Sequence, residues 1–411
     1  MKRIGSLVPV LATAMLVTLG CGQDAESPTG PEPAPSLSSA SAATLSFRQI
    51  SAGTSHTCGL TTDGSAYCWG SNGGRLGDGT SQRRLKPVAV AGGHRFVLIS
   101  AGGSHTCAIT EENRAYCWGG GGSGQLGDGT QSSRSTPGLI QGFRFRQIRA
   151  GFLHTCGITP TDVAFCWGNG DNGQLGNGGG HSDRPVRVAR GLRWIQVIAG
   201  ASHSCGVTTD NRAWCWGANN FGQLGDGTKT IRRKPALVAG GLSFRQVVPG
   251  WGWFMDLNDP SVDDGAHTCG LTTDDKAYCW GRNDGGVVHA GELDATSSVP
   301  VKIAGGRSYR VLNTGAFHAC AVTLSRVTYC WGSNAEGQLG VGSATTRSST
   351  PVRVSGGLDV SAVSAGTLGL HSCSWTTTDR RAYCWGRNDE GQLGDGTTTD
   401  RPTPVAVSGP L

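Results

Sequence analysis

One pattern occurs seven times in this chain of 411 residues and limits its possible folds more than any other feature. Its first copy is "HTCGLTTDGSAYCWG", in which a His stands two positions before a Cys, and a second Cys, followed by Trp, comes ten positions later. The first Cys of the copies falls at positions 58, 107, 156, 205, 269, 320 and 373, so the period is close to 50 residues. Such a period indicates one structural unit built repeatedly.

Each unit contains four short runs typical of β-strands. In the first unit they are "FRQISAG", "HTCGL", "AYCWG" and, after a glycine-rich loop, "PVAV". A period near 50 with β-type segments indicates a propeller rather than a helical array, so the chain is predicted to be an all-β, seven-bladed β-propeller. A "PV.V" strand precedes every "FRQI" strand except the first, and the chain ends with a spare one, "PTPVAVSG". We expect this C-terminal strand to join the first blade and close the ring.

The N-terminal segment has the pattern of an export signal. Lys2 and Arg3 precede a short apolar stretch, and "TLGC" ending at Cys21 resembles a bacterial lipobox, although Thr18 stands where the box usually has Leu. We expect residues 1–21 to be a signal peptide with lipidation at Cys21, residues 22–44 to be a flexible Pro/Ser/Ala-rich tether, and residues 45–411 to be the propeller. The predicted location is the bacterial cell envelope as a membrane-anchored lipoprotein, with plain secretion as the alternative.

The spacing of each cysteine pair is compatible with a tight hairpin. If Cys58 lies opposite Cys68, a three-residue turn follows whose last position needs positive φ, and Gly64 or a matching Asn or Asp stands there in the first five units. Arg326 in the sixth unit argues against this register. The seventh unit has one extra residue between its cysteines, for which we expect a bulge.

Three chemical states of the cysteines are compatible with the pattern. Disulfides are favoured because the chain is predicted to be exported and every unit has both partners. The alternatives are buried free thiols and a metal site formed by His56, Cys58 and Cys68, although structural zinc sites usually space their ligands more closely. The predicted disulfides are Cys58–Cys68, Cys107–Cys117, Cys156–Cys166, Cys205–Cys215, Cys269–Cys279, Cys320–Cys330 and Cys373–Cys384.

Seven tryptophans follow the second cysteines and fall on the opposite side of their strands. They are Trp69, Trp118, Trp167, Trp216, Trp280, Trp331 and Trp385. We interpret them as blade-to-blade packing, with carbohydrate stacking as the alternative. The His of each unit is interpreted as a structural residue that is hydrogen-bonded near the blade turn.

The departures from the repeat indicate where a partner binds. The fifth unit is 15 residues longer than the first ones, within the segment 250–267, which contains four large apolar side chains and several aspartates. Long basic loops fall on the same predicted face, so we expect one binding surface there. The predicted partner-binding residues are Trp251, Trp253, Phe254, Met255, Arg83, Arg84, Arg232 and Arg233. Calcium binding by the aspartates, packing of the insertion on its own blade and ordinary solvated loop charge are the alternatives.

The sequence motifs of the repeat resemble those of a known family. "FRQISAG..HTCGLT.DG.AYCWG.N..GQLGDGT......PV.V" is similar to the regulator of chromosome condensation repeat, over all seven units from Leu45 to Leu411. Two departures are that the family usually has apolar or neutral residues at the cysteine positions, and that the fifth unit reads "GRNDGGVVHAGEL" in place of "GQLG". The resemblance implies guanine-nucleotide exchange activity, as in the eukaryotic founder. However, the family also includes a bacterial protein inhibitor of β-lactamase, so the fold does not decide the function.

The sequence contains no arrangement of residues that indicates an enzyme. No nucleophile motif with a paired base, no phosphate-binding loop and no spaced pair of carboxylates is evident, so we expect neither catalysis nor a cofactor. The formal net charge of +6 is too weak to indicate nucleic-acid binding. We therefore predict a monomeric, exported scaffold that binds a protein or an acidic macromolecule. Exchange-factor activity is the alternative, although an exported chain does not meet a cytoplasmic GTPase.

Overall fold

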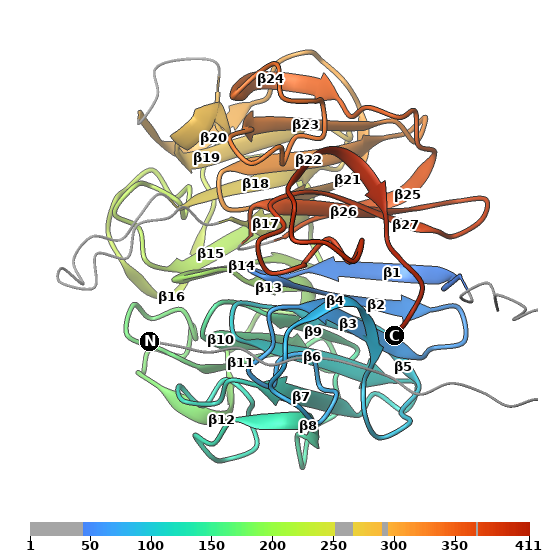
Figure 1. The fold of residues 1–411 in the computed structure, drawn as a ribbon. Helices are drawn as coiled ribbons and strands as arrows, with labels where there is room; N and C mark the ends of the chain where they lie inside the picture. The colour runs from blue at the N-terminus through green and yellow to red at the C-terminus, as the bar shows by residue number, and fades with distance from the viewer. Residues whose placement is uncertain (1–43, 251–265, 290–294, 367–368) are drawn as a thin grey trace, which may run out of the picture. The chain divides into compact units, whose positions relative to one another are not determined.

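The computed structural model describes residues 44–250, 266–289, 295–366 and 369–411. The contacts divide the chain into two units, Met1–Ser41 and Ala42–Leu411, and all the described residues belong to the second. Within these residues the strands form seven four-stranded antiparallel sheets, which Figure 1 shows in the order of the sequence. The predicted all-β, seven-bladed propeller is confirmed.

Each sheet is one blade, numbered here from 1 to 7. Blade 1 contains β1 (Phe47–Ala52), β2 (His56–Thr61), β3 (Ala66–Gly70) and β4 (Arg84–Ala89). Blade 2 contains β5 (Phe96–Ala101), β6 (His105–Thr110), β7 (Ala115–Gly119) and β8 (Arg134–Leu139). Blade 3 contains β9 (Gln147–Ala150), β10 (His154–Ile158), β11 (Ala164–Gly168) and β12 (Ser182–Arg187). Blade 4 contains β13 (Trp194–Ala199), β14 (His203–Thr208), β15 (Ala213–Gly217) and β16 (Arg232–Leu237).

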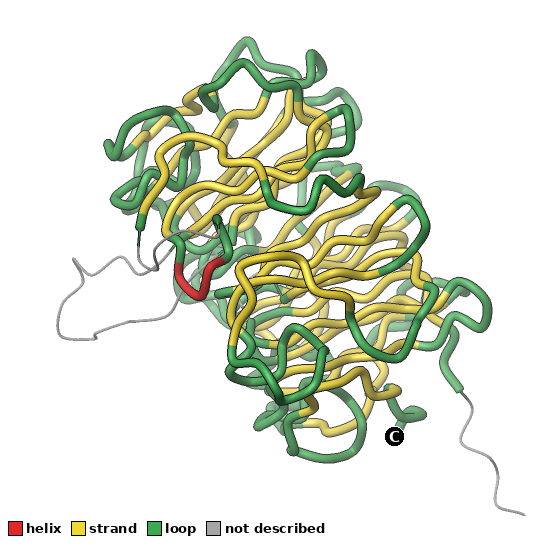
Figure 2. Tube along the Cα trace, turned by 90° about the horizontal axis from the view of Figure 1, so that it is seen from above, coloured by secondary structure: helices red, strands yellow, loops and turns green. Residues whose placement is uncertain are grey.

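The last three blades follow the same order. Blade 5 contains β17 (Phe244–Pro249), β18 (His267–Thr272), β19 (Ala277–Arg282) and β20 (Thr296–Lys302), with the short 3₁₀ helix η1 (Asp284–Gly286), red in Figure 2, between its last two strands. Blade 6 contains β21 (Tyr309–Thr314), β22 (His318–Thr323), β23 (Thr328–Ser333) and β24 (Arg347–Arg353). Blade 7 contains β25 (Val360–Ala365), β26 (His371–Thr376), β27 (Ala382–Gly386) and β28 (Arg401–Ala406).

The strands alternate in direction, so the connections of the blades gather on two faces. The face with the turns between first and second strands and the long loops between third and fourth strands is called the loop face. The opposite face, with the tight turns between second and third strands and the connections from one blade to the next, is called the hairpin face. On the hairpin face each tight turn contacts the next blade; Phe96 N, for example, donates to Gly64 O over 2.9 Å.

The C-terminal strand does not join the first blade, so this part of the ring-closure prediction is wrong. β28 pairs with β27 of its own blade, and β4 completes blade 1. The ring is closed by contacts between whole blades, with β1 lying against β25 and β26 (blue against red in Figure 1). The hydrogen bonds that join the chain ends include those from Ala52 N to Ser364 Oγ, from Gly396 N to Leu85 O and from Leu411 N to Pro87 O, each 3.0 Å.

The hairpin register is as expected, with Cys58 directly opposite Cys68 and Leu60 opposite Ala66. The last turn residue has positive φ in all these turns, including Arg326, the residue that argued against the register, at 63°. The turn therefore imposes a left-handed backbone conformation on Arg326, at a cost of about 1 kcal/mol. The predicted bulge in blade 7 is wrong: Thr376 N donates to Arg381 O, so the extra residue lengthens the turn, and the strand ladder is regular.

The hydrophobic core lies between the blades, at interfaces called seams here. At the seam of blades 1 and 2, the Cys58–Cys68 disulfide packs with Leu76 on one side and with Phe96 and Trp118 of blade 2 on the other. Each of the other seams has a cluster that likewise contains a disulfide and a tryptophan. Each of the seven tryptophans that follow a second cysteine is almost fully buried, and replacing such a side chain by Ala costs about 3–5 kcal/mol.

Candidate functional site

All seven predicted disulfides are present, and each joins the second and third strands of one blade. The Cα atoms of Cys58 and Cys68 are 4.1 Å apart, as expected for residues directly opposite each other. The other six pairs have the same placement. Because both sulfurs are bonded to each other and fully buried, they are not available to a metal ion together with His56.

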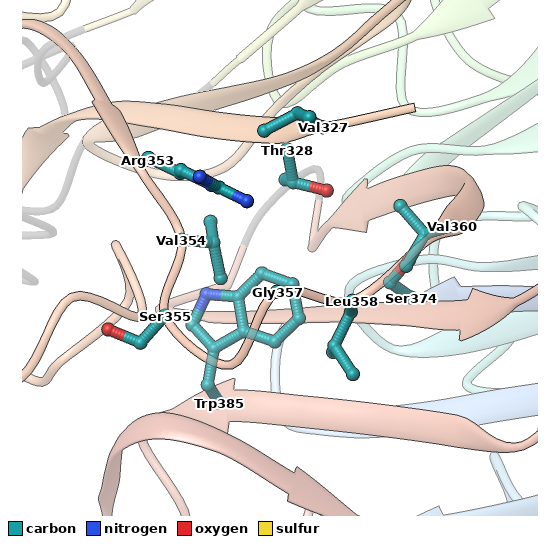
Figure 3. A pocket seen from close by; sticks show the side chains of 10 residues that line it. All are labelled: Val327, Thr328, Arg353, Val354, Ser355, Gly357, Leu358, Val360, Ser374 and Trp385. Atoms are coloured by element: carbon teal, nitrogen blue, oxygen red, sulfur yellow. The ribbon is translucent and has the colours of Figure 1, made fainter. Parts of the chain in front are cut away.

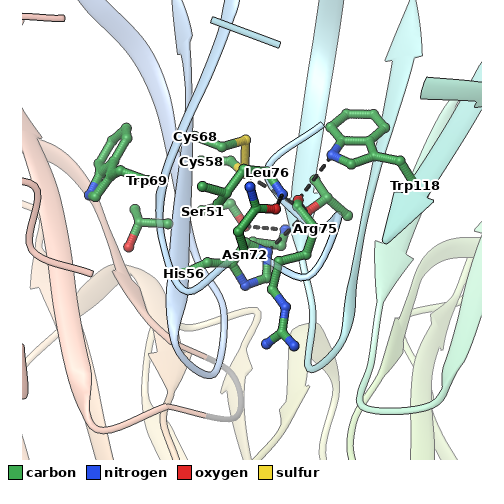
Figure 4. The surroundings of a disulfide bond; sticks show 12 residues. Ser51, His56, Cys58, Cys68, Trp69, Asn72, Arg75, Leu76 and Trp118 are labelled. Carbon is green, nitrogen blue, oxygen red and sulfur yellow. Dashed lines mark hydrogen bonds between the residues drawn. A yellow bond between two sulfur atoms is a disulfide. The ribbon is translucent and has the colours of Figure 1, made fainter. Parts of the chain in front are cut away.

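A relay of hydrogen bonds crosses each seam beside the disulfide. At the seam of blades 1 and 2, His56 Nε2 lies 2.9 Å from Thr106 Oγ1, and this hydroxyl donates to Arg75 O over 2.8 Å. The same carbonyl accepts a bond from Trp118 Nε1 at 3.0 Å. Figure 4 shows His56, Arg75 and Trp118 around the disulfide. Gly77 permits this approach, since a Cβ there would lie 2.6 Å from Trp118 Nε1.

The relay and the burial together determine the tautomer and the charge of the histidines. The carbonyl can only accept, so the Thr106 hydroxyl must donate to it and accept from His56, which therefore carries its proton on Nε2. Complete burial lowers the pKa of His56 well below 6.5, and burial lowers the pKa of His105 to about 3. These histidines are neutral parts of the seam at physiological pH, in agreement with the structural interpretation of the sequence.

The relay recurs around the ring with one exception. The histidine–hydroxyl pairs are His56–Thr106, His105–Thr155, His154–Ser204, His203–Thr268, His318–Ser372 and His371–Thr57. At the seam of blades 5 and 6, Ala319 stands at the hydroxyl position, and His267 Nε2 has no hydrogen-bond partner among the described residues. All seven tryptophans donate to a loop carbonyl of the neighbouring blade, which confirms their packing role.

A small cavity at the seam of blades 6 and 7 is a packing defect rather than a ligand site. It measures about 10 Å³ and lies between Val360, Ser374 and Trp385 (Figure 3). In the other six blades the position of Val360 holds an aromatic side chain beside the tryptophan, as Phe47 lies beside Trp69 with ring centroids 6.0 Å apart. The smaller valine leaves the space, which holds one water at most.

Part of the predicted basic surface has a structural role. Arg84 forms a salt bridge of 2.9 Å with Asp78 in the "GDGT" loop, and Asp78 is 3% exposed. Burial alone would raise the pKa of Asp78, but hydrogen bonds from Thr80, Asn72 and Arg84 hold it below its usual value. The same clamp pairs Arg134 with Asp128, Arg232 with Asp226 and Arg401 with Asp395. Arg84 and Arg232 are thus engaged within their own blades.

Arg83, which directly precedes β4, and Arg233 in β16 are exposed and contact the preceding blade. Arg83 Nη1 donates to Asp389 O at 3.1 Å and lies 3.6 Å from Glu390 Oε2, while Arg233 Nη2 donates to Asp171 O at 3.0 Å. Both side chains remain accessible on the loop face. The other predicted partner-binding residues, Trp251, Trp253, Phe254 and Met255, lie outside the described residues, as does Cys21.

An open hollow of about 200 Å³ lies on the loop face between blades 7 and 1. It is lined by Thr54, Ser55, Gly369, Leu370, Arg387, Asp389, Glu390 and Gln392. Arg83 borders it through its contacts with Asp389 and Glu390. The sequence analysis missed this hollow because its walls come from opposite ends of the propeller, more than 300 residues apart.

Two features are absent from the part of the chain that the structure describes. In residues 44–411, apart from the gaps named above, no group of three or more His, Cys, Asp or Glu side chains is placed to hold a metal ion. Over the same residues no helix is long and apolar enough to cross a membrane.

Comparison with known proteins identifies the family. The model of the RCC1-like domain matches residues 14–367, and that of the regulator of chromosome condensation (RCC1) repeat matches residues 379–411. This chain belongs to the RCC1-like family. Human E3 ubiquitin-protein ligase HERC2 is 38% identical over 148 residues, which are 34% of this chain and 3% of HERC2. The ultraviolet-B receptor UVR8 of Arabidopsis thaliana is 33% identical over 136 residues, 32% of this chain and 30% of UVR8. The chain thus spans less than a third of either relative.

Solved RCC1-like structures share the fold at low sequence identity. Human WBSCR16 superimposes with a TM-score of 0.73 at 20% identity, covering 84% of this chain and 94% of that one. Prp20p of Saccharomyces cerevisiae, described with its binding to Gsp1p and histones, gives a TM-score of 0.71 at 20% identity and covers 85% and 87%. These likenesses establish the fold of this RCC1-like chain.

Proposed function

We propose that this RCC1-like protein is an exported, lipid-anchored scaffold that binds a protein or another macromolecule in the bacterial cell envelope. The seven buried disulfides carry this proposal, because disulfides in such number persist in oxidising compartments and are rare in the cytosol. The same observation disfavours the exchange-factor alternative, which requires a cytosolic GTPase. The repeated side chains of the seams are occupied by packing and hydrogen bonds, which favours binding over catalysis.

The loop face is the proposed binding surface. Arg83 and Arg233 are accessible there, and the hollow between blades 7 and 1 offers both a guanidinium and carboxylates to a partner. The insertion 251–264 follows β17 and precedes β18 in the sequence, and its aromatic side chains would supply most of the binding energy if they are desolvated by the partner. Exposed arginines mainly steer association and lose their effect in salt.

Fractionation of cells followed by pull-down of the anchored protein tests the location and the partner together. The wild-type protein should sediment with membranes, and Cys21→Ser should release it into the soluble fraction after a salt wash while the propeller stays folded. A soluble wild-type protein whose mature chain begins elsewhere would contradict the anchor. Recovery of a cytosolic GTPase as the partner would instead favour exchange-factor activity.

The binding surface is tested by variants of the loop face. Deletion of 251–264 should abolish capture of the partner and leave the melting curve nearly unchanged. The double variant Arg83→Ala/Arg233→Ala should slow association several-fold, because both side chains are exposed. Arg84→Ala serves as the contrast, since it should loosen the Asp78 loop rather than act on the partner. If the deletion unfolds the ring, the insertion is a packing element and the proposed surface is wrong.

A further inference from the structure

The hairpin face carries a net positive charge that the sequence analysis did not recognise. Lysine and arginine outnumber aspartate and glutamate about two to one in the tight turns, the connections between blades and the adjoining strand ends. On the loop face the two kinds of charge nearly balance among the described residues. The mild net charge of the whole chain therefore conceals an uneven distribution between two faces.

Many of the basic side chains on the hairpin face are exposed and have no ion-pair partner among the described residues. Four arginines form salt bridges there: Arg95 with Asp63, Arg146 with Asp162, Arg245 with Asp275 and Arg326 with Asp359. Exposed arginines without such a bridge include Arg114, Arg144, Arg190, Arg212, Arg310 and Arg380. They come from blades 2, 4, 6 and 7 and from the connections on either side of blade 3, so the positive charge is distributed around the ring rather than concentrated at one point.

One part of this face is hollowed between two of these arginines. An open hollow of about 470 Å³ is lined by Arg114 of the tight turn of blade 2 and by Arg144, Gln141 and Phe143 of the connection to blade 3. Glu112 lies close enough for both guanidiniums to lower its pKa, and the leading cause of that shift is a hydrogen bond from Thr110. Two positive charges and one negative charge leave the hollow suited to a single phosphate group.

The chain enters the propeller on this same face. Ser46 O accepts a bond from Thr62 N in the tight turn of blade 1, and Phe47 N donates to Arg380 O in the tight turn of blade 7. Any segment that precedes Leu45 is therefore attached at the hairpin face. A membrane anchor at Cys21 would therefore be connected to this face through the 22–44 tether.

We propose that the hairpin face rests on a bilayer of anionic lipids, with the hollow between Arg114 and Arg144 receiving a headgroup phosphate. A planar array of phosphates matches basic side chains spread around a ring, whereas a linear polyanion would favour a stripe and a small partner a single cluster. The loop face is then directed away from the membrane and is free for the proposed partner. This inference does not depend on lipidation, because the charge is a property of the folded propeller itself.

Binding of the unlipidated full chain to vesicles tests the proposal. Purified Cys21→Ser protein should co-sediment with phosphatidylcholine vesicles that contain about 30% phosphatidylglycerol at about 50 mM salt, and should not bind pure phosphatidylcholine. Each basic residue near an anionic surface contributes about 1 kcal/mol, so Arg114→Gln/Arg144→Gln should bind about 30-fold more weakly. The matched control Arg83→Gln/Arg233→Gln, on the loop face, should bind as Cys21→Ser does.

Each contrary outcome overturns a definite part of the idea. Equal binding to neutral vesicles, or an equal loss in the loop-face control, contradicts recognition of anionic lipid by the hairpin face. If the protein binds soluble dextran sulfate but not the anionic vesicles, the membrane proposal is wrong and the ligand of the hairpin face is a linear polyanion. Melting curves of the two double variants that match the curve of Cys21→Ser exclude unfolding as the cause. Failure of the partner pull-down would contradict the proposed scaffold function without affecting the vesicle result.

Discussion

The seam between blades 1 and 2 is complete, whereas the seams on either side of blade 6 each lack one element. In the first, His56, Thr106 and Trp118 meet at one loop carbonyl, and Phe96 fills the space beside the tryptophan. At the seam of blades 5 and 6 the hydroxyl is missing because Ala319 replaces threonine or serine. At the seam of blades 6 and 7 the aromatic side chain is missing because Val360 replaces it.

The differences show which elements of a seam can be lost separately. The tryptophan bond to the neighbouring loop is kept in both incomplete seams, by Trp331 to Val287 O and by Trp385 to Gln338 O. The disulfide is also kept in every blade. The hydroxyl and the aromatic ring are therefore supporting elements, and the tryptophan and the disulfide are shared by all seven seams.

Acidification should produce the largest effect, because it acts on every seam at once. The folded-state pKa of His105, His154 and His267 is about 3, below the ordinary value of 6.5, so the unfolded chain binds more protons as pH falls below 6.5. Each such histidine should lower the free energy of unfolding by about 2 kcal/mol between pH 7 and pH 5. Thermal melts across this range measure the slope. Hydrogen bonds lower the pKa values of Asp78, Asp226 and Asp395 in spite of their burial, so these three carboxylates remain ionised in this window.

The variant His267→Gln measures the contribution of the incomplete seam of blades 5 and 6 to this acid sensitivity. His267→Gln removes one buried protonation site without removing a hydroxyl contact of the relay. Its stability should therefore fall less between pH 7 and pH 5 than that of the wild type. An unchanged slope in this variant would show that His267 does not contribute to the acid sensitivity.

Removal of the relay hydroxyl should come next in size. Thr106→Val keeps the shape of the side chain but leaves His56 Nε2 without its buried partner, which should cost about 1–3 kcal/mol. The cost should appear in the midpoint of chemical unfolding. Thr398→Val, at an exposed loop position, is the matched control and should change stability very little. Equal effects of the two substitutions on the unfolding midpoint would show that the relay does not stabilise the protein.

The reverse substitution should repair the incomplete seam by a smaller amount. Ala319→Thr supplies the missing hydroxyl to His267 and should raise the free energy of unfolding by about 1 kcal/mol. Nitrogen-15 spectra of the labelled imidazole provide a second measurement, since a new hydrogen bond at Nε2 shifts that resonance. A stability gain without such a shift would point to strand propensity alone as its cause.

Filling the cavity beside Trp385 should have the smallest effect. In blade 1 the ring of Phe47 lies over Gly59, and in blade 2 the ring of Phe96 packs with Ala108, whereas in blade 7 the larger Ser374 occupies the matching position. Val360→Phe alone should therefore clash, while Val360→Phe/Ser374→Gly should stabilise the protein by a few tenths to about 1 kcal/mol. Thermal melts of both variants measure these changes in stability. A rise in the stability of Val360→Phe alone would show that Ser374 does not obstruct the phenylalanine ring.

The number of blades, the cysteine pairs and the hairpin register could all be predicted because they depend on short-range pattern. Cys58 and Cys68 are ten residues apart, and the turn between them must reverse the chain within three residues. The pairing of β28 was predicted wrongly because each "PV.V" strand stands between two units. In the folded chain, Arg84 of β4 pairs with Gly70 of β3. This pairing shows that each "PV.V" strand belongs to the unit that precedes it.

The candidate faces were less accessible to sequence reasoning. Arg84 was assigned to a partner although its ion pair with Asp78 is only six residues away and recurs with the "GDGT" word, a signal that was present in the sequence. The hollow between blades 7 and 1 and the charge of the hairpin face depend on which distant turns become neighbours. No local pattern shows this, since Phe47 and Arg380 meet only through closure of the ring.

The placement of the disulfides also bears on how the protein acquires them. Each bond joins two cysteines that follow one another directly along the chain, 10 or 11 residues apart. If the chain is exported as proposed, the members of a pair emerge close together in time, so an oxidase that joins cysteines in order of appearance produces the native set without an isomerase. Cys21 is the one thiol that would disturb this order, and a lipid on it would remove the competitor before the first pair appears. The attachment to the membrane would then also safeguard oxidative folding.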